Sequence, residues 1–256
     1  MLEDDFTYVL RKALAGHQLS PAGAAALAGT AEHAVLSFLR GSFSAVTARR
    51  LAPVLGLNAT AFAAHADYHP KPLAQASIHS LDLPFDNGRV NAWLIDAGAS
   101  KILFDSGYEP RDFIPALGEL PERAFITHGH RDHVGGLHHL LQHHIPVHAA
   151  GIRETIPMKS GDSVCCGPLI VRACDLSGHA SPALGYLIEG LPAPVLVTGD
   201  ALFAGSIGGC ATPTIYQQAL RTLRAALAPL PDTTILLPGH GPATTLGEER
   251  TGNPFL

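Results

Sequence analysis

The stretch THGHRDHVGG, residues 127–136, constrains this chain more than any other feature, because it holds four metal-binding side chains within six positions. These side chains are His128, His130, Asp132 and His133. Imidazole and carboxylate groups are common ligands of divalent cations. The stretch follows the apolar run 124–126, and its Gly135-Gly136 pair is typical of a turn. We therefore predict a metal site in a turn at the end of a strand.

The composition is that of an ordinary globular protein, with 256 residues of which 46% are hydrophobic and 15% charged. A formal net charge of -5 argues against a polyanion as the main partner, so we expect a small-molecule substrate and no nucleic acid. We find no apolar run of the roughly 18 residues that a membrane helix needs, and the acidic N-terminus does not resemble a signal peptide. We therefore expect a cytoplasmic protein without a membrane partner.

Residues 1–66 are rich in alanine and predict a small all-α domain of four or five short helices. Ser20-Pro21 has the residues preferred at a helix N-cap and first position. The segment resembles the helix-turn-helix of Cro-like phage repressors, which implies DNA binding. However, its basic residues are nearly cancelled by acidic ones, which removes most of the electrostatic attraction to DNA. We therefore favour a cap or a homodimer interface and keep a DNA-binding regulator as an alternative.

The pattern changes after residues 67–73, a proline-containing segment that we interpret as a linker. Residues 74–256 contain strand-like runs such as GRVNAWLIDAG and KILFDSG, interspersed with helical segments. We therefore predict an α+β protein in which a second, β-rich domain spans residues 74–256.

Three later turns repeat the arrangement of the first. Each follows a strand-like run and carries one potential ligand beside a glycine: His179, Asp200 and His240. Turns at strand ends can converge on one rim of a packed sheet. We therefore expect these side chains to join the first four in a site with seven candidate ligands.

This ordered set of motifs resembles the metallo-β-lactamase superfamily. The H-x-H-x-D-H motif is complete, and KILFDSG is similar to the strand and turn in which members carry a structural aspartate, here Asp105. The resemblance extends from about residue 75 to residue 256. It implies an αβ/βα sandwich of two packed sheets with helices outside, and a metal site at the edge between the sheets.

The resemblance also implies a role for each ligand. His128, His130 and His179 would hold one metal, Asp132, His133 and His240 would hold a second, and Asp200 would bridge them. We expect two divalent ions, zinc first, with iron or manganese accepted by the same ligands. A hydroxide shared by the metals would attack a carbonyl group, with Asp132 as proton acceptor. Asp105 would orient a ligand histidine.

Within the superfamily, the chain is most similar to the glyoxalase II-like (hydroxyacylglutathione hydrolase-like) branch. The tail PGHGPATTLGEERTGNPFL and the segment GDALFAGSIGG carry this resemblance. It implies a dinuclear metallohydrolase that cleaves a thioester or a related ester or lactone. The sequence departs from the pattern at residues 209–211, where many members have Arg and Asp. We consider Cys210 in that segment, and Tyr186, as substrate contacts.

An alternative function is that of a mononuclear-iron persulfide dioxygenase, which resembles the same scaffold. It would use a triad of two histidines and one carboxylate, namely His128, His179 and Asp200. The native metal and the substrate stay open at this point. The histidines of the segment 138–144 are interpreted as a solvated helix face.

Overall fold

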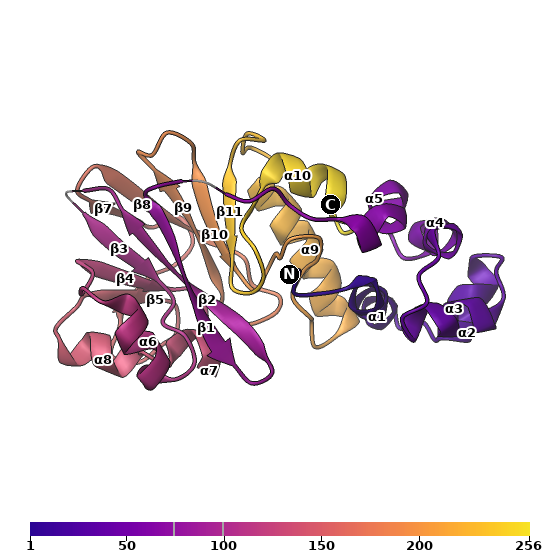
Figure 1. The fold of residues 1–256 in the computed structure, drawn as a ribbon, viewed down its shortest axis with the longest axis horizontal. Helices are drawn as coiled ribbons and strands as arrows, with labels where there is room; N and C mark the ends of the chain where they lie inside the picture. The colour runs from indigo at the N-terminus through magenta and orange to yellow at the C-terminus, as the bar shows by residue number, and fades with distance from the viewer. Residues whose placement is uncertain (74, 99) are drawn as a thin grey trace.

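The structure is a computed structural model that describes residues 1–73, 75–98 and 100–256. It has an α+β fold in which two six-stranded sheets pack face to face between layers of helices (Figure 1). This confirms the predicted fold class. The predicted start of the β-rich domain, residue 74, lies outside the described residues.

The first sheet has the strand order β1-β2-β3-β4-β5-β6. Its strands are β1 (Ile78–Phe85), β2 (Gly88–Asp96), β3 (Lys101–Phe104), β4 (Arg123–Ile126), β5 (Val147–Ala149) and β6 (Ile156–Pro157). Helices α6 (Pro110–Leu117), α7 (Arg131–Val134) and α8 (Leu137–Gln142) follow β3 and β4 in the chain. Phe113 of α6 and Leu140 of α8 pack with Leu103 of β3 in one apolar cluster, so these helices cover the outer face of this sheet (Figure 1).

The second sheet has the strand order β12-β11-β10-β9-β8-β7. Its strands are β7 (Ser163–Cys166), β8 (Leu169–Asp175), β9 (Leu184–Glu189), β10 (Val195–Gly199), β11 (Ile235–Pro238) and β12 (Thr244–Thr245). Helices α9 (Pro213–Leu227) and α10 (Leu246–Gly252) cover its outer face. Strands β10 and β11 are parallel, so their carboxyl ends lie at the same edge of the sheet. Turns that follow them are therefore neighbours.

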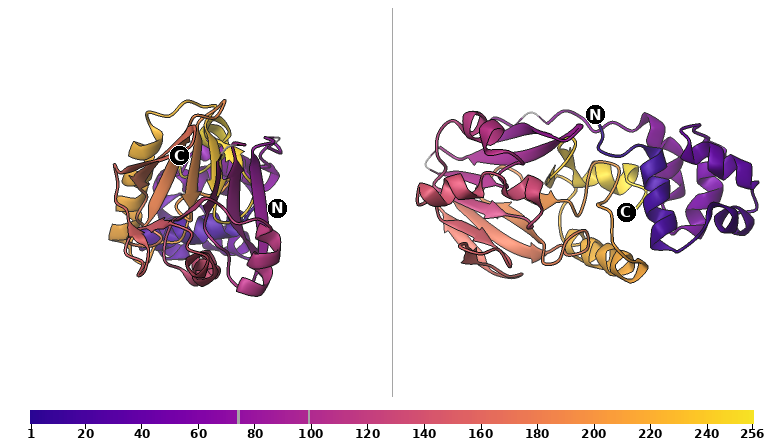
Figure 2. Two further views of the ribbon diagram at one scale, coloured as in Figure 1. Left: turned by 90° about the vertical axis from the view of Figure 1, so that its left-hand side faces the viewer. Right: turned by 90° about the horizontal axis from the view of Figure 1, so that it is seen from below.

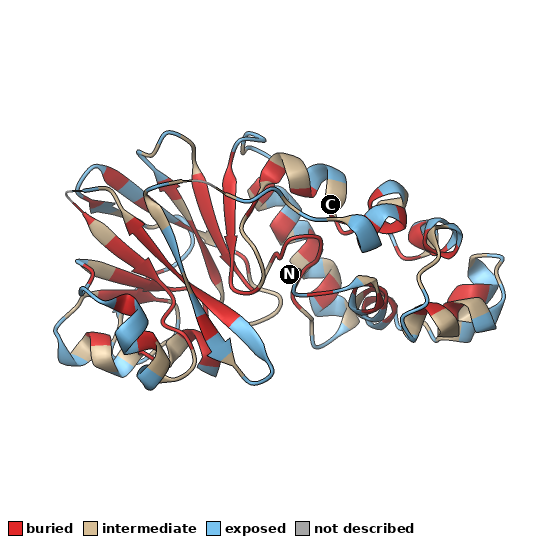
Figure 3. Cartoon of the chain, in the orientation of Figure 1, coloured by how far each residue is buried: buried red, intermediate tan, exposed pale blue. Residues whose placement is uncertain are grey.

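The core between the sheets contains stacked aromatic side chains. The rings of Phe104 and Phe125 lie 5.3 Å apart, and the ring of Tyr186 from the opposite sheet lies 5.3 Å from that of Phe125. Both sheets are formed largely by buried residues (Figure 3). This packing holds the two sheets together next to the edge where the candidate ligands lie.

The N-terminal region consists of five α-helices and a short 3-10 helix, at one end of the molecule (Figure 2). They are α1 (Phe6–Gly16), α2 (Pro21–Leu27), α3 (Glu32–Leu39), α4 (Ala45–Val54), α5 (Ala59–Ala64) and η1 (His65–Asp67). Ser20 caps α2 through a hydrogen bond from the backbone N–H of Gly23, as predicted. Asp5 and Asn58 cap α1 and α5 in the same way.

These helices pack on one another, with Phe38 in contact with Phe6 and Phe62, and also on the rest of the chain. Their buried residues, such as Leu10 and Phe62, belong to one apolar cluster with Leu220 of α9 and Phe255 near the end of the chain. The N-terminal region therefore packs against α9 and α10, at one end of the molecule (Figure 1). Among the described residues, no helix combines the length and apolar character needed to cross a membrane.

Candidate metal site

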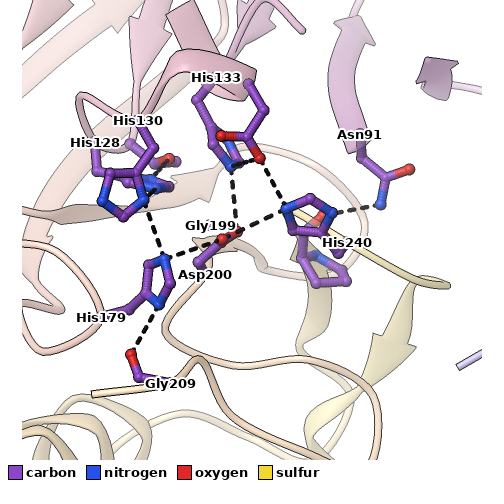
Figure 4. A network of polar contacts seen from close by, with 12 residues as sticks. Asn91, His128, His130, His133, His179, Gly199, Asp200, Gly209 and His240 are labelled. Atoms are coloured by element: carbon purple, nitrogen blue, oxygen red, sulfur yellow. Dashed lines mark hydrogen bonds and ion pairs between the residues drawn. The ribbon is translucent and has the colours of Figure 1, made fainter. Parts of the chain in front are cut away.

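The seven candidate ligands converge at one edge of the sandwich from four chain segments (Figure 4). His128 and His130 follow β4, and His179 follows β8. Asp200 follows β10 and His240 follows β11, the two parallel strands. The main chain of His128 also pairs with Ala183 of the opposite sheet, which links the two halves of the sandwich at the site.

The backbone of the histidine-rich stretch differs from the predicted turn. His128 and His130 precede a helix, but Asp132 and His133 lie within the short helix α7. The side chains of adjacent residues on a helix point in directions about 100° apart. Asp132 and His133 therefore approach the site from different directions. The turn prediction was therefore right for the first two ligands and wrong for the other two.

One group of ligand atoms comes from His128, His130 and His179. The Nδ1 atom of His130 lies 3.0 Å from Nε2 of His128 and 3.1 Å from Nε2 of His179. Imidazole nitrogens that face one another at this distance can surround one cation after small rotations of the rings.

A second group comes from Asp132, His133 and His240. Nε2 of His240 lies 3.2 Å from Oδ2 of Asp132, and Nε2 of His133 lies 3.6 Å from the same oxygen. Asp200 lies between the groups, because its Oδ2 is 3.5 Å from Nε2 of His179 and also 3.5 Å from Nε2 of His240. A carboxylate in this position can contact a cation on either side.

The donor set fits divalent cations. The buried atoms Nε2 of His133 and Oδ1 of Asp200 lie 3.3 Å apart, and neither has a hydrogen-bond partner among the described residues. A buried polar atom without a partner is costly, whereas metal coordination would satisfy both atoms. Histidine nitrogens and carboxylate oxygens suit zinc, iron and manganese.

The surroundings of His133 and His240 favour positive charge, whereas burial lowers the pKa of His128 and of His179. Burial alone would lower the pKa of His133, but the carboxylates of Asp200 and Asp105 outweigh it and hold that pKa well above its ordinary value. Burial likewise opposes the charged form of His240, but hydrogen bonds to Asp132 and Asp200 raise its pKa to about 10. The pKa of Asp200 lies well below its usual range despite burial, because His133 and His240 face it. In the absence of a cation, the positive charges of protonated imidazoles balance the negative charges of the carboxylates.

Asp105 contacts the His133 ring at Nδ1, the nitrogen that faces away from the site. Its Oδ2 lies 2.8 Å from Nδ1 of His133, and its Oδ1 accepts a hydrogen bond of 2.8 Å from the backbone N–H of Thr127. The Thr127 hydroxyl donates to the same carboxylate. Asp105 therefore fixes the orientation of the His133 ring and leaves Nε2 directed into the site.

Asn91 of β2 is a supporting residue that the motifs did not reveal. Its side-chain amide donates to the carbonyl oxygens of Pro238 and Gly241, at 3.1 and 2.8 Å. The indole N–H of Trp93 also donates to Pro238, at 2.9 Å. The loop that carries His240 is thus tied to the first sheet, and His240 itself lies with Nδ1 2.6 Å from the carbonyl oxygen of Arg89.

The contact of the segment 203–209 with His179 is a second feature that the sequence patterns did not reveal. Nδ1 of His179 lies 2.9 Å from the carbonyl oxygen of Gly209, which directs Nε2 of the ring into the site (Figure 4). Gly208 approaches so closely that an added Cβ would lie 1.9 Å from the carbonyl oxygen of Asp200 and 2.9 Å from Cβ of His179. Only glycine fits there, so this segment lies directly against two candidate ligands.

The two residues predicted as substrate contacts occupy different surroundings. Tyr186 is fully buried in the core, and its hydroxyl donates to the carbonyl oxygen of Ile126 at 2.7 Å. That prediction was wrong, because the side chain packs between the sheets and does not reach the surface of the site. Cys210 is half-buried and lines a small cavity of about 10 Å³ together with His179 and Asp200. Its contact with substrate stays a prediction.

The structure combines a sandwich of two sheets with a candidate metal site at one edge. The sequence profile of the Metallo-beta-lactamase superfamily matches residues 85–171. The chain therefore carries a metallo-beta-lactamase superfamily domain, as the resemblance implied.

Its relatives include hydroxyacylglutathione hydrolases. The chain is 28% identical to hydroxyacylglutathione hydrolase GloC of Haemophilus influenzae over 184 residues, which are 60% of this chain and 86% of the relative. It is 29% identical to the hydroxyacylglutathione hydrolase of Hahella chejuensis over 59% of this chain, but spans only 57% of that longer protein. The crystal structure of TTHA1623 in a di-iron-bound form is 26% identical, with a TM-score of 0.52 over 74% of this chain and 100% of that one.

Proposed function

We propose that this protein is a dinuclear metal-dependent hydrolase. His128, His130 and His179 would hold one divalent cation, Asp132, His133 and His240 would hold the other, and Asp200 would contact both. The observation that carries the proposal is the convergence of these seven side chains, with two buried atoms, Nε2 of His133 and Oδ1 of Asp200, that face one another and form no hydrogen bond among the described residues. Zinc is the expected metal, and the relative with two irons makes iron a strong second candidate.

The chain's own residues would position the metals and accept a proton during the reaction. A pair of divalent cations supplies Lewis acidity and lowers the pKa of water toward neutrality. Asp132 is nearly buried, and although burial raises its pKa, the hydrogen bond from His240 lowers it below the usual value. Its carboxylate would therefore be ionised, and we propose it as the proton acceptor because it lies among the candidate ligands.

The proposed substrate is a thioester, and related esters and lactones are the next candidates. The support is the similarity to the two hydroxyacylglutathione hydrolases, together with a site whose carboxylates and imidazoles suit carbonyl hydrolysis. A small molecule is thus the expected partner. Association of two chains through the N-terminal helices, and a cytoplasmic location, remain further proposals.

The test combines metal analysis with a substrate screen. Protein purified without added metal is measured by elemental analysis and assayed against S-acyl glutathiones, lactones and phosphodiesters. We expect close to two metals per chain and thioester hydrolysis that His130→Ala abolishes. His144→Ala, which removes an exposed histidine outside the site, is the matched control and should keep both properties. Hydrolysis that persists in His130→Ala with less than one metal per chain would refute the proposal.

The same measurements separate the alternatives. One iron per chain with oxygen consumption and no hydrolysis would assign a persulfide dioxygenase that uses His128, His179 and Asp200. A regulator whose N-terminal helices bind DNA would show an affinity for duplex DNA that falls steeply with salt.

A further inference from the structure

A partly buried ion pair connects the N-terminal helices to the candidate metal site. Asp4 lies just before α1 and is only 4% exposed, and Lys12 of α1 forms an ion pair with it. The Lys12 ammonium also donates to the carbonyl oxygen of Ile207 at 2.7 Å, and the Ser206 hydroxyl donates to Asp4 at 2.6 Å. Two charged groups from the beginning of the chain therefore hold a segment some 200 positions away.

The segment held in this way is residues 203–209, which follows Asp200 and ends at the carbonyl that orients His179. The Lys12 ammonium lies 5.3 Å from the ring centre of Phe203, at its beginning, and binds Ile207 near its end. Gly208 and Gly209 come next and contact Asp200 and His179. A shift of this segment would therefore move a hydrogen bond to a candidate ligand.

Further contacts of this segment come from His65, whose Nε2 lies 2.9 Å from the Gly205 carbonyl oxygen, and from the tail of the chain. The fully buried Glu249 accepts a hydrogen bond of 2.8 Å from the Gly205 backbone N–H, and the Asn253 amide donates to the carbonyl oxygen of Ser206 at 3.0 Å. These contacts fix residues 205 and 206 from the side of α10. The Ile207 carbonyl, which is nearest to Gly208 and Gly209, is bound by Lys12.

Stability alone does not account for the pair. A buried ion pair loses the hydration of both charges, and replacing it with apolar residues of similar size is often neutral or stabilising. Its distinctive property is geometric, because the ammonium and the carboxylate bind polar groups at defined positions of the segment. Apolar side chains would fill the same space without fixing those positions.

We propose that Asp4 and Lys12 are positioning residues that make the N-terminal helices part of the metal site. They hold the Ile207 carbonyl and the Ser206 hydroxyl, and thereby place Gly209 so that it orients His179. This inference rests on the proposed function, because it takes His179 as a metal ligand. It gives the N-terminal region a role that is independent of DNA binding.

The test is the double substitution Asp4→Leu with Lys12→Met in the full-length chain, which removes the charges and keeps the apolar volume. Metal affinity is measured by competition with a chromophoric chelator, and the cobalt-substituted protein is examined by visible absorption, which reports the ligand geometry. We expect a fold with unchanged circular dichroism, an affinity for the first metal lower by roughly tenfold, and an altered cobalt spectrum. Arg11→Met is the matched control, since Arg11 is adjacent on α1 but donates to Leu39 within the N-terminal region.

A second variant covers the case in which the double substitution does not fold. Ser206→Ala removes only the hydroxyl that binds Asp4, and we expect a smaller decrease in affinity with the same change in the cobalt spectrum. A wild-type affinity and spectrum in the folded variants would overturn the positioning role. His179→Ala distinguishes this outcome from failure of the proposed site. If it loses the metal, only the positioning role is wrong, whereas unchanged binding in His179→Ala refutes both.

Discussion

The side-chain amide of Asn91 binds the main chain on both sides of His240, donating to Pro238 at 3.1 Å and to Gly241 at 2.8 Å. Asn91 belongs to the first sheet and His240 to a loop of the second. One buried amide thus sets the position of a candidate ligand across the sandwich edge.

The first prediction concerns this amide. Asn91→Ala leaves two carbonyl oxygens with one donor fewer, so we expect the free energy of unfolding to fall by about 1–3 kcal/mol. The loop that carries His240 should loosen, and metal affinity should decrease by roughly tenfold. Denaturant titration and chelator competition measure the two effects. Ser80→Ala is the control, because it removes only the hydroxyl that donates to Asn91. Equal metal affinity in the two variants would contradict the positioning role of the amide.

The second prediction concerns Asp105. Asp105→Asn keeps the shape of the side chain but removes the negative charge beside Nδ1 of His133. The ring would lose the partner that favours its orientation, so metal affinity should fall by about 10- to 100-fold. Isothermal titration of the metal-free protein measures the change. Glu119→Gln, at an exposed carboxylate that pairs with Lys101, serves as the control and should bind metal as the wild type does. A wild-type metal affinity in Asp105→Asn would show that Asp105 does not support metal binding.

The third prediction concerns removal of the metals. Cations that bind only the folded state stabilise it by about 2.7 kcal/mol when their free concentration is 100 times the dissociation constant. We therefore expect a chelator to lower the melting temperature of the wild type and excess zinc to raise it again. Asp200→Ala should abolish this response, because Asp200 lies beside both ligand groups. A melting temperature that does not respond to zinc in the wild type would argue against the site.

The sequence predicted the local part of this site, and the reason is physical. His128 and His130 are close in the chain, and each later ligand stands beside a glycine after an apolar strand, so short patterns reveal them. The Asn91 amide donates to main-chain carbonyls on either side of His240, and Gly209 contacts His179 through its own carbonyl oxygen. Any residue type carries such carbonyls, so no motif marks these contacts. Asp4 and Ser206 are 202 positions apart, and only the tertiary fold shows that they meet.

The fourth prediction concerns pH. Burial lowers the pKa of His65, although the Gly205 carbonyl and nearby carboxylates oppose this effect. The unfolded chain then binds a proton more readily than the folded one, so this histidine costs stability as the pH falls below about 6.5. We expect the difference in unfolding free energy between wild type and His65→Gln to shift against the wild type from pH 7.5 to 5.5. The slope of this free-energy difference against pH cannot exceed about 1.4 kcal/mol per pH unit, because one histidine binds one proton. Urea titrations with chelator present measure it, and a difference independent of pH would contradict the prediction.

The last prediction concerns the contact between α1 and α9. Alanine is favoured over glycine in helices by up to about 1 kcal/mol, yet a Cβ on Gly16 would lie 2.3 to 2.5 Å from the ring of Tyr216 in α9. The ring would have to move, and overpacking of this kind costs about 1–3 kcal/mol. We therefore expect Gly16→Ala to lower the free energy of unfolding. Gly23→Ala in α2 should be neutral or stabilising, because its Cβ would meet only side-chain atoms, Oγ of Ser20 at 3.3 Å and Cδ2 of Leu19 at 3.8 Å. Denaturant titration compares the two. If Gly16→Ala proves as stable as Gly23→Ala, the N-terminal helices do not pack on α9, and the positioning role of Asp4 and Lys12 loses its structural basis.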